Sequence, residues 1–296
     1  MKKILLTGSS GFLGTNLYSF LKNKYNIKKL DISNSDYNYD LKKEIPNFKN
    51  KFDLVIHAAG KAHIISKNED EIKDFYDVNY EGTRNLLNSF NLFSPKNFIF
   101  ISSVSVYGLN FGSLIKEKHS LDAKDPYGKS KVLTENLIQK WGKKNNVNIL
   151  ILRLPLLAGK NPPGNLQKMI KAIRNKYFFN ISGASPKKSI VLVDDIVSHI
   201  DIFYGKRGIY NLTDGHNPTV EELSFVISKQ CKRSKPFKLP YSFLKLISSI
   251  GDVFPFFPLN SLKLKKLTSE LTFDDSKARK LLGWRPNKVI NNFKIN

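Results

Sequence analysis

The sequence is poor in cysteine and has no long uninterrupted apolar run. Its single cysteine, Cys231, excludes an internal disulfide, which is typical of a cytoplasmic protein. The longest apolar stretch, Phe243 to Leu259, is interrupted by two charged residues and two prolines, so it does not predict a membrane span. After the basic start only Ile4 to Leu6 are apolar, which is too short for a secretory signal. We therefore expect a cytoplasmic protein.

Arginine is also scarce, although the chain is strongly basic. Of the 48 Lys and Arg residues only seven are Arg, and against 25 acidic residues they give a net charge of +23. The lysines are spread along the chain, and no nucleic-acid recognition motif accompanies them. We therefore expect no nucleic-acid or membrane partner and a surface that attracts anionic substrates. Binding to RNA, DNA or an acidic membrane surface stays open as a minor alternative.

Zinc-binding patterns are absent as well. The five histidines have no Cys or His partner at the spacing of a zinc site, so we expect no metal. What the chain does have is ample apolar sequence, at 41% hydrophobic and 12% aromatic over 296 residues. Strand-like and helix-like segments alternate along it. This pattern predicts an α/β protein with a doubly wound (Rossmann) parallel sheet.

The first motif is a glycine-rich turn. The apolar run Ile4 to Leu6 reads as a buried strand, and the segment after it carries glycines at 8, 11 and 14 before a helix-like segment begins. Gly8 would let the chain turn, Gly11 would let the backbone approach a phosphate, and Gly14 would let the helix pack closely. The pattern predicts a dinucleotide site at a helix N-terminus.

An acid at the next strand favours one cofactor. Asp31 lies in the apolar segment Ile27 to Ile32, 17 residues after Gly14, and an acid about 20 residues after the turn commonly binds the adenosine ribose. A carboxylate there repels a 2′-phosphate. The sequence therefore predicts NAD in preference to NADP.

Small and hydroxyl residues follow two further predicted strands. Leu54 to Ile56 runs into His57-Ala58-Ala59-Gly60, and Phe98 to Ile101 runs into Ser102 and Ser103. Ligands of open parallel sheets bind at the carboxyl ends of strands, so we expect these residues at the crevice.

The chemistry is predicted at Tyr127 and Lys131. Pro126 suits the first turn of a helix, so the two residues share one helix face. A tyrosine is a poor base at neutral pH, but a nearby ammonium and a cationic nicotinamide both favour its phenolate. Tyr127 is therefore a candidate proton-transfer group.

Taken in order, these motifs resemble the extended short-chain dehydrogenases/reductases, specifically the nucleotide-sugar epimerase/dehydratase family. The resemblance continues through Asp40-Leu41, Asn79 to Thr83, Leu152 to Leu156, Gly164 to Leu166, Lys188 to Asp195 and Phe273 to Pro286, so it covers nearly the whole chain. It implies catalytic roles for Tyr127, Lys131 and Ser103. It implies cofactor contacts from Gly8, Ser10, Gly11, Phe12, Leu13, Gly14, Asp31, Asp40, Leu41, Ala58, Ala59, Ser102, Tyr127, Lys131 and Pro155, and substrate contacts from Ser103, Asn165 and Lys188.

The resemblance also implies an organisation in two parts. We expect an NAD-binding domain over residues 1–158 and a smaller, mixed α/β substrate domain over 159–296, interleaved with the first. Strand-like segments at 188–193 and 208–212 could each rejoin the main sheet or serve the sugar site. Segments 221–229 and 243–250 are predicted helices. A homodimer built on the helices of 70–90 and 127–145 is implied by the resemblance alone.

The implied function is NAD-dependent epimerisation of a nucleotide sugar at C4 through a 4-keto intermediate. The substrate is expected to be a UDP-hexose or UDP-N-acetylhexosamine of carbohydrate biosynthesis, such as a lipopolysaccharide or capsule sugar. Reduction of a nucleotide 4-ketosugar with NAD(P)H uses the same residues and stays open, and a non-catalytic nucleic-acid or protein binder is a third interpretation. Dehydration is rejected because Val104-Ser105 stands where dehydratases carry Asp-Glu after the catalytic Ser/Thr.

Two departures from the family pattern bear on the substrate. Lys188 stands where many members carry an Arg for the diphosphate, so its contact would lack bidentate geometry. Lys265 and Lys266 lie near the usual place of a second basic contact. Leu156 occupies a position where galactose-epimerising members often have Asn, which weakens a specific assignment to UDP-galactose.

Overall fold

A seven-stranded parallel sheet forms the centre of the computed structural model, which describes residues 1–62, 68–254 and 259–295. One of the five histidines, His63, and the two prolines of the apolar stretch lie outside these ranges. The strand order is β11-β7-β5-β4-β1-β2-β3, and every pair is parallel. The strands are β1 (Lys3–Thr7), β2 (Asn26–Asp31), β3 (Tyr37–Asn38), β4 (Leu54–His57), β5 (Asn97–Ser103), β7 (Asn148–Leu154) and β11 (Gly208–Asn211). The doubly wound fold predicted from the sequence is confirmed.

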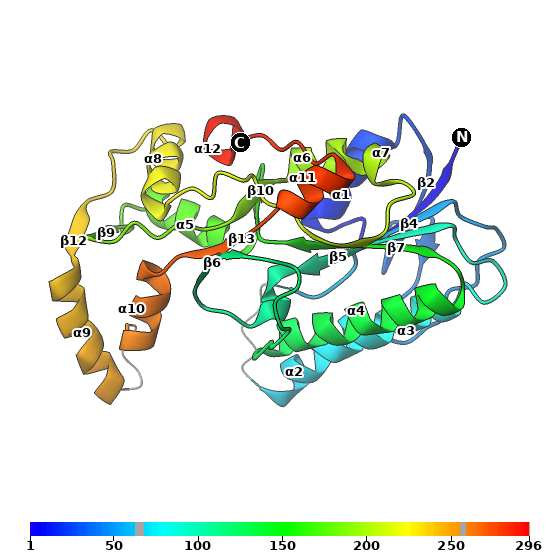
Figure 1. Ribbon diagram of the computed structural model, residues 1–296, viewed down its shortest axis with the longest axis horizontal. Helices are drawn as coiled ribbons and strands as arrows, with labels where there is room; N and C mark the ends of the chain where they lie inside the picture. The colour runs from blue at the N-terminus through cyan, green and yellow to red at the C-terminus, as the bar shows by residue number, and fades with distance from the viewer. Residues whose placement is uncertain (63–67, 255–258, 296) are drawn as a thin grey trace.

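Helices cover both faces of this sheet (Figure 1). One face carries α2 (Glu69–Tyr76), the π-helical turn η1 (Asp77–Glu81), α3 (Gly82–Asn88) and α4 (Pro126–Lys144). The other carries α1 (Phe12–Leu21), α6 (Val193–Ser198), α7 (Ile200–Phe203) and α11 (Ser276–Leu282). The strand order reverses between β1 and β4, so their carboxyl ends flank a ligand crevice at the switch point.

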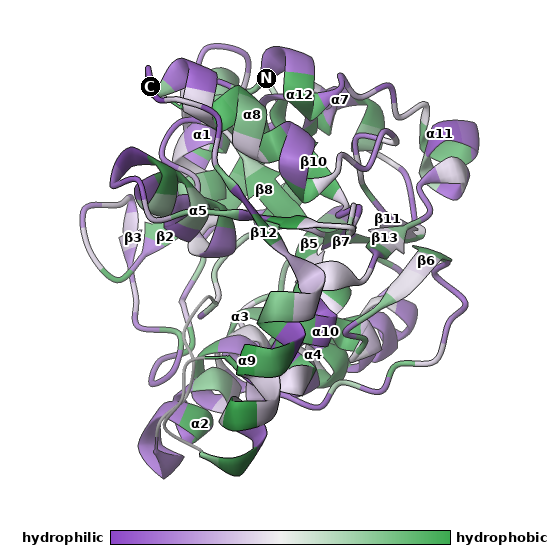
Figure 2. Ribbon diagram, turned by 90° about the vertical axis from the view of Figure 1, so that its left-hand side faces the viewer, coloured by the Kyte–Doolittle hydropathy of each residue, from purple (hydrophilic) through white to green (hydrophobic). Residues whose placement is uncertain are grey.

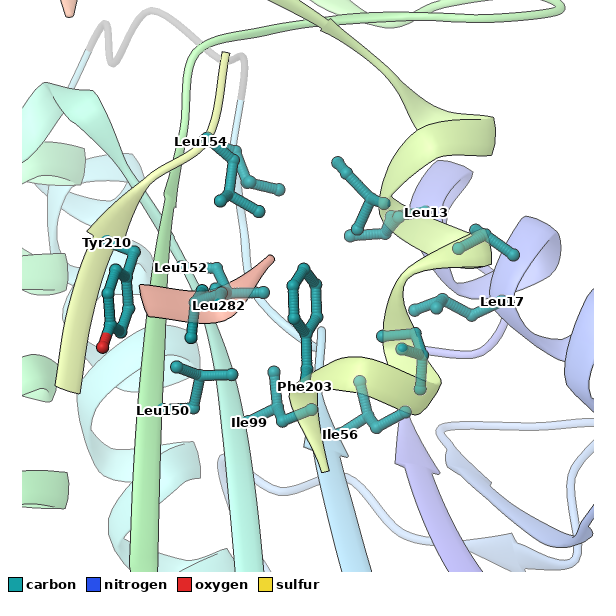
Figure 3. Packing of buried hydrophobic residues seen from close by; sticks show 14 of the residues in the cluster. Leu13, Leu17, Ile56, Ile99, Leu150, Leu152, Leu154, Phe203, Tyr210 and Leu282 are labelled. Atoms are coloured by element: carbon teal, nitrogen blue, oxygen red, sulfur yellow. The ribbon is translucent and has the colours of Figure 1, made fainter. Parts of the chain in front are cut away.

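The core explains why the strands read as continuous apolar runs. Both faces of the sheet are covered, so neighbouring side chains of one strand are buried on opposite sides. Figure 3 shows Leu13 and Leu17 of α1 facing Ile56 and Ile99 of the sheet, with the ring of Phe203 packed between the two layers. All but Leu13 are at most 1% exposed, and Leu13 is 7% exposed.

Three short parallel pairs extend the fold beyond the main sheet. They are β8 (Leu156–Ala158) with β10 (Ile190–Leu192), β9 (Asn180–Ser182) with β12 (Lys238–Pro240), and β6 (Gly112–Ile115) with β13 (Leu271–Phe273). Of the two strand-like segments expected after residue 158, one forms β10 beside β8 and the other, β11, joins the main sheet. The domain division at residue 158 stays a prediction.

The remaining helices belong to the later part of the chain. They are α5 (Gly164–Arg174), α8 (Val220–Gln230), α9 (Tyr241–Val253), α10 (Ser261–Thr268) and α12 (Val289–Asn292), while η2 (Val104–Tyr107) is a 3-10 turn after β5. In the ranges that the structure describes, no helix combines the length and apolar character needed to cross a membrane.

Candidate active site

The glycine turn between β1 and α1 has little room for side chains at two of its three glycines. Gly8 has a φ of +69°, and a Cβ there would lie 2.5 Å from the backbone nitrogen of Ala59. A Cβ at Gly14 would lie 2.0 Å from the Gly8 carbonyl oxygen. Gly11 caps α1, and a Cβ there would meet only that same oxygen, at 3.3 Å. The turn is therefore closed by Gly8 and Gly14 and open at Gly11.

The residues after Gly11 carry the turn into the helix. Phe12 opens α1, and its ring lies against Gly159, whose Cβ would sit 3.1 Å from it. Leu13 points into the core. The first N–H groups of a helix have no partner within it, so those of α1 are candidate donors to a ligand.

Asp31 lies against the same turn. Its Oδ2 accepts hydrogen bonds from the backbone N–H of Ser10 at 2.8 Å and from the hydroxyl of Ser9 at 3.3 Å. Its Oδ1 accepts from the N–H of Ile32 at 2.9 Å. The acid and the glycines, which are distant in sequence, are thus brought together at the ends of β1 and β2.

Asp40 and Leu41 lie in the turn after β3. The Asp40 carboxylate accepts from the Lys42 N–H at 3.1 Å. Leu41 is buried beside Gly82 of α3, and its carbonyl oxygen accepts from the Asn85 side chain at 2.8 Å. This turn is therefore fastened to α3, on the same side of the crevice as β2.

Ala58 and Ala59 follow β4 directly and pack against Gly8. The residue before them, His57, is fixed between two hydroxyls, at 2.7 Å from Thr7 Oγ1 and 2.8 Å from Thr83 Oγ1. Burial lowers the pKa of His57 to about 3, with the charge of Lys131 adding to the effect. His57 is therefore neutral, and its role beneath the site is structural.

Ser103 and Tyr127 are hydrogen-bonded through their side chains. Ser103 ends β5, and its Oγ also accepts from the Ser105 N–H at 3.1 Å. Tyr127 stands in the first turn of α4, which Asp125 caps by accepting from Gly128 N at 2.9 Å. A Cβ at Gly128 would lie 2.7 Å from the Ser105 carbonyl oxygen, so this glycine lets α4 approach the serine segment.

Lys131 lies one helical turn further along α4, above the sheet. Its Nζ donates to the Ile101 carbonyl oxygen at 3.1 Å and is 4.6 Å from the ring centroid of Phe100. Burial lowers its pKa to about 8, and Glu135 opposes this shift. Burial also raises the pKa of Tyr127, against the Ser103 hydrogen bond that lowers it. Near neutral pH the protein by itself therefore holds a protonated phenol beside a mostly charged lysine.

Asn79 joins α4 to the end of β4. It lies in the π-helical turn, is 2% exposed, and donates to Ser130 Oγ at 2.8 Å. Its Oδ1 accepts from the Lys61 N–H at 2.8 Å. A Cβ at Gly60 would lie 2.9 Å from this oxygen and 3.2 Å from Lys131 Nζ. Gly60 therefore admits the lysine to the crevice.

Ser102, whose contact with the cofactor stays a prediction, belongs to a buried ionic network. Its hydroxyl donates to Glu135 Oε1 at 2.5 Å, and Glu135 pairs with Arg153, whose Nη2 lies 2.6 Å from Oε2. Arg153 also donates to the Tyr107 hydroxyl at 3.0 Å. Sequence reasoning did not single out Glu135, although its position four residues after Lys131 on one helix face was visible.

The remaining predicted residues lie where the later part of the chain meets the sheet. Pro155 stands between β7 and β8, and Asn165 is an exposed second residue of α5. The Lys188 ammonium donates to the carbonyl oxygens of Ser269 at 2.9 Å and Lys266 at 3.2 Å, at the end of α10. Burial lowers the pKa of Lys188, against Glu270, which raises it. Lys188 thus holds α10, and its contact with a diphosphate stays a prediction.

The donors at the glycine turn fit NAD. The turn offers a helix N-terminus, an open face at Gly11 and the carboxylate of Asp31 beside it. Within the described ranges, no group of three or more His, Cys, Asp and Glu side chains could hold a metal ion.

Comparison with known proteins gives consistent results. The N-acetyl-alpha-D-glucosaminyl-diphospho-ditrans,octacis-undecaprenol 4-epimerase of Escherichia coli O157:H7 is 29% identical, over 93% of this chain and 88% of its own. The UDP-glucose 4-epimerase of Vibrio cholerae is also 29% identical, over 98% and 92%. The solved UDP-Glc/GlcNAc 4-epimerase of Campylobacter jejuni shares the fold, with a TM-score of 0.74 at 22% identity over 97% and 95% of the two chains.

A family model supplies the assignment. The model described as the NAD dependent epimerase/dehydratase family matches residues 4–212, from β1 past β11. This span includes the glycine turn, Ser103, Tyr127 and Lys131. The family predicted from the sequence is confirmed, and with it an NAD-dependent enzyme, against the non-catalytic interpretation. The chain therefore belongs to the NAD dependent epimerase/dehydratase family.

Proposed function

We propose that the protein epimerises a diphosphate-linked hexose at C4. The observation that carries this proposal is the grouping of Ser103, Tyr127 and Lys131 at the carboxyl edge of the sheet, beside the glycine turn. The epimerase names of the relatives support it. Tyr127 supplies an acid-base group and Lys131 a positive charge. Epimerisation at C4 requires no further acid or base.

Each residue has a role that its surroundings favour. NAD, when bound, supplies a hydride acceptor and donor. Tyr127 takes the proton of the C4 hydroxyl. It returns the proton after the 4-keto sugar has rotated in the site to present its other face. Ser103, which hydrogen-bonds Tyr127, holds the same hydroxyl. Burial raises the pKa of Tyr127. The Lys131 ammonium and the cationic nicotinamide of NAD, when bound, would favour the phenolate electrostatically.

Two candidates exist for the group that the diphosphate links to the sugar. Uridine is the candidate implied by the sequence resemblance, and Asn165 and Lys188 are the proposed diphosphate contacts. A polyprenol is the second, because the Escherichia coli relative acts on an undecaprenol-linked sugar. The strongly exposed apolar face of α9, joined to Lys188 through α10, specifically favours the polyprenol.

We infer further that the enzyme works as a cytoplasmic homodimer and serves lipopolysaccharide or capsule sugar synthesis. These inferences rest on the sequence resemblance. No nucleic-acid partner is proposed.

One experiment separates epimerisation from 4-ketosugar reduction. The purified protein is assayed for bound NAD and then offered UDP-hexoses, UDP-N-acetylhexosamines and a polyprenyl-diphosphate N-acetylhexosamine, with products separated by chromatography. Interconversion of C4 epimers with no consumption of added cofactor supports the proposal. Turnover that consumes stoichiometric NADH would favour the reductase instead.

The proton role of Tyr127 has its own test. Tyr127→Phe should lower turnover by at least about a hundredfold, because general acid-base groups contribute about 10²–10⁴-fold, while leaving bound NAD unchanged. Tyr177→Phe, at an exposed tyrosine, is the matched control and should keep wild-type activity. Wild-type turnover in Tyr127→Phe would remove the proposed base.

A further inference from the structure

Helix α9 presents a continuous apolar face to solvent. Phe243, Leu246, Ile250 and Val253 recur at helical spacing and are 50%, 67%, 46% and 71% exposed. The side of α9 that packs on the protein carries Leu244, which is 3% exposed. Figure 2 shows this helix on the outside of the molecule, with much of its ribbon in the hydrophobic colour. The helix is therefore apolar on two sides, and only one of them is needed for the fold.

The charged residues in the sequence of this segment are almost all positive. Between Tyr241 and Thr268 the sequence has four lysines, at 245, 263, 265 and 266, and one acid, Asp252. The Asp252 carboxylate accepts hydrogen bonds from the N–H of Ser261 at 2.9 Å and from its hydroxyl at 2.5 Å. The single acid is thus hydrogen-bonded within the same segment.

The hairpin of α9 and α10 is tightly built. A Cβ at Gly251 would lie 1.8 Å from the Leu259 carbonyl oxygen, so the two arms approach as closely as glycine allows. Leu264 of α10 is buried, 3% exposed, while Leu262 on the same helix is 57% exposed. The exposed face of α9 is therefore held outward by a well-packed element.

The hairpin is tied to the candidate active site. Lys188 binds the end of α10 through the carbonyl oxygens of Lys266 and Ser269. The next strand, β13, pairs with β6, which follows the Ser103 segment in the chain. A surface bound to α9 would hence be held at a fixed place relative to the predicted sugar site.

We propose that the α9–α10 hairpin docks on the surface of an anionic lipid bilayer. The apolar face of α9 enters the boundary between headgroups and acyl chains, and the lysines contact the acidic headgroups. A second copy of the chain is a poorer occupant because it would bring the same positive charge to the interface. Nucleic acid is poorer because it offers no apolar surface to aliphatic side chains.

This proposal replaces the expectation of no membrane partner with the alternative that the charge of the sequence left open, binding to an acidic membrane surface. A helix lying in the interface needs no spanning segment. The proposal does not depend on the proposed function, because binding is measured without substrate. If the sugar carrier is a polyprenol, docking would bring the active site to the membrane in which that carrier resides.

The test is co-sedimentation of the full-length protein with vesicles of phosphatidylcholine containing phosphatidylglycerol, and with phosphatidylcholine alone. We expect binding to the first and little to the second. The double variant Leu246→Asp/Ile250→Asp should weaken binding by at least about tenfold, because it places charge in the apolar face. Leu92→Asp is the matched control, at a leucine 85% exposed near the amino end of β5, and should bind as wild type.

A second variant gives a positive signal. Leu246→Trp should show a blue shift of its fluorescence when the acidic vesicles are added, since the indole would leave water. Failure of wild type to bind these vesicles at low salt would overturn the proposal, as would binding that the double variant leaves unchanged. Sedimentation equilibrium adds one more outcome: self-association lost in the double variant, without vesicle binding, would assign the face to a second copy.

Discussion

At the scale of single residues, the hydrogen bonds of His57 determine which of its ring nitrogens carries the proton. Thr83 Oγ1 donates to the Asn79 carbonyl oxygen at 2.6 Å, so it can only accept from His57 Nε2. A neutral ring protonated on Nε2 accepts at Nδ1, so the Thr7 hydroxyl donates to Nδ1, while Thr7 Oγ1 itself accepts from the Ala59 N–H at 3.3 Å. His57 is thus a neutral imidazole protonated on Nε2, which links β1, β4 and α3 under the site.

This arrangement predicts an acid-sensitive fold. The pKa of His57 is about 3 in the folded protein, against 6.5 for a histidine in water, so the unfolded chain binds the proton first. The stabilisation is complete above pH 6.5 and is lost as the pH falls from 6.5 towards 3. His57→Asn should flatten this part of the pH profile of the melting temperature.

The control for that measurement is His119→Asn, at an exposed histidine. It should retain the wild-type pH dependence. An unchanged profile in His57→Asn would mean that other groups cause the acid sensitivity.

A second residue-scale prediction concerns the Glu135–Arg153 pair. Their side chains are 0% and 2% exposed, so Glu135→Gln would leave a buried guanidinium without its counter-charge. The free energy of unfolding should drop by about 3–5 kcal/mol, measured by urea denaturation. Glu44→Gln, at an exposed glutamate, should change it by less than about 0.5 kcal/mol.

The same variant has an effect that a purely structural role would not produce. Glu135 raises the pKa of Lys131, so its loss should move the basic limb of the pH–rate profile to lower pH. A profile that falls uniformly in height, with no movement along the pH axis, would restrict Glu135 to stability.

At the scale of elements, two glycines of the turn are predicted to have different roles, Gly14 in packing and Gly11 in binding NAD. Gly14→Ala forces a Cβ to within 2.0 Å of the Gly8 carbonyl oxygen, so it should destabilise the protein by about 1–3 kcal/mol even without NAD. Gly11→Ala meets only one atom, at 3.3 Å, and should unfold nearly as wild type while binding NAD at least about tenfold more weakly.

Thermal unfolding without cofactor and titration with NAD check the two variants. Equal NAD affinity in Gly11→Ala and wild type would exclude the predicted approach of a phosphate at this glycine. Equal stability of Gly14→Ala and wild type would show that the turn has room to relax.

At the scale of the whole molecule, the homodimer implied by the resemblance can be tested on exposed apolar residues. Figure 1 shows α2, α3 and α4 together on one side of the sheet, away from α9. Ile72 on α2 is 38% exposed and Leu133 on α4 is 43% exposed. Ile72→Asp/Leu133→Asp should convert a dimer into monomers in analytical ultracentrifugation, because it places charges in the proposed helix bundle.

The α9 variant Leu246→Asp/Ile250→Asp serves as the comparison and should stay dimeric. A wild-type protein that sediments as a monomer at all concentrations would contradict the dimer.

The sequence was sufficient for the fold class and the family. The glycine spacing, Asp31 after the second strand and the Tyr127/Lys131 pair predicted the doubly wound fold and the NAD-dependent family, and both are confirmed. These features could be read because each depends on short-range rules: backbone clearance at glycine, helical spacing, and the period of buried strands.

Long-range pairing was decided only by the tertiary structure. It placed Ser102 on Glu135 and Arg153, which lie 33 and 51 residues further along the chain, and it set Lys188 on the end of α10. It also joined β11 to the main sheet while β10 paired with β8. Sequence periodicity determines which face of an element is apolar. Which neighbour covers that face, and which face of α9 is left in water, depends on how distant segments pack.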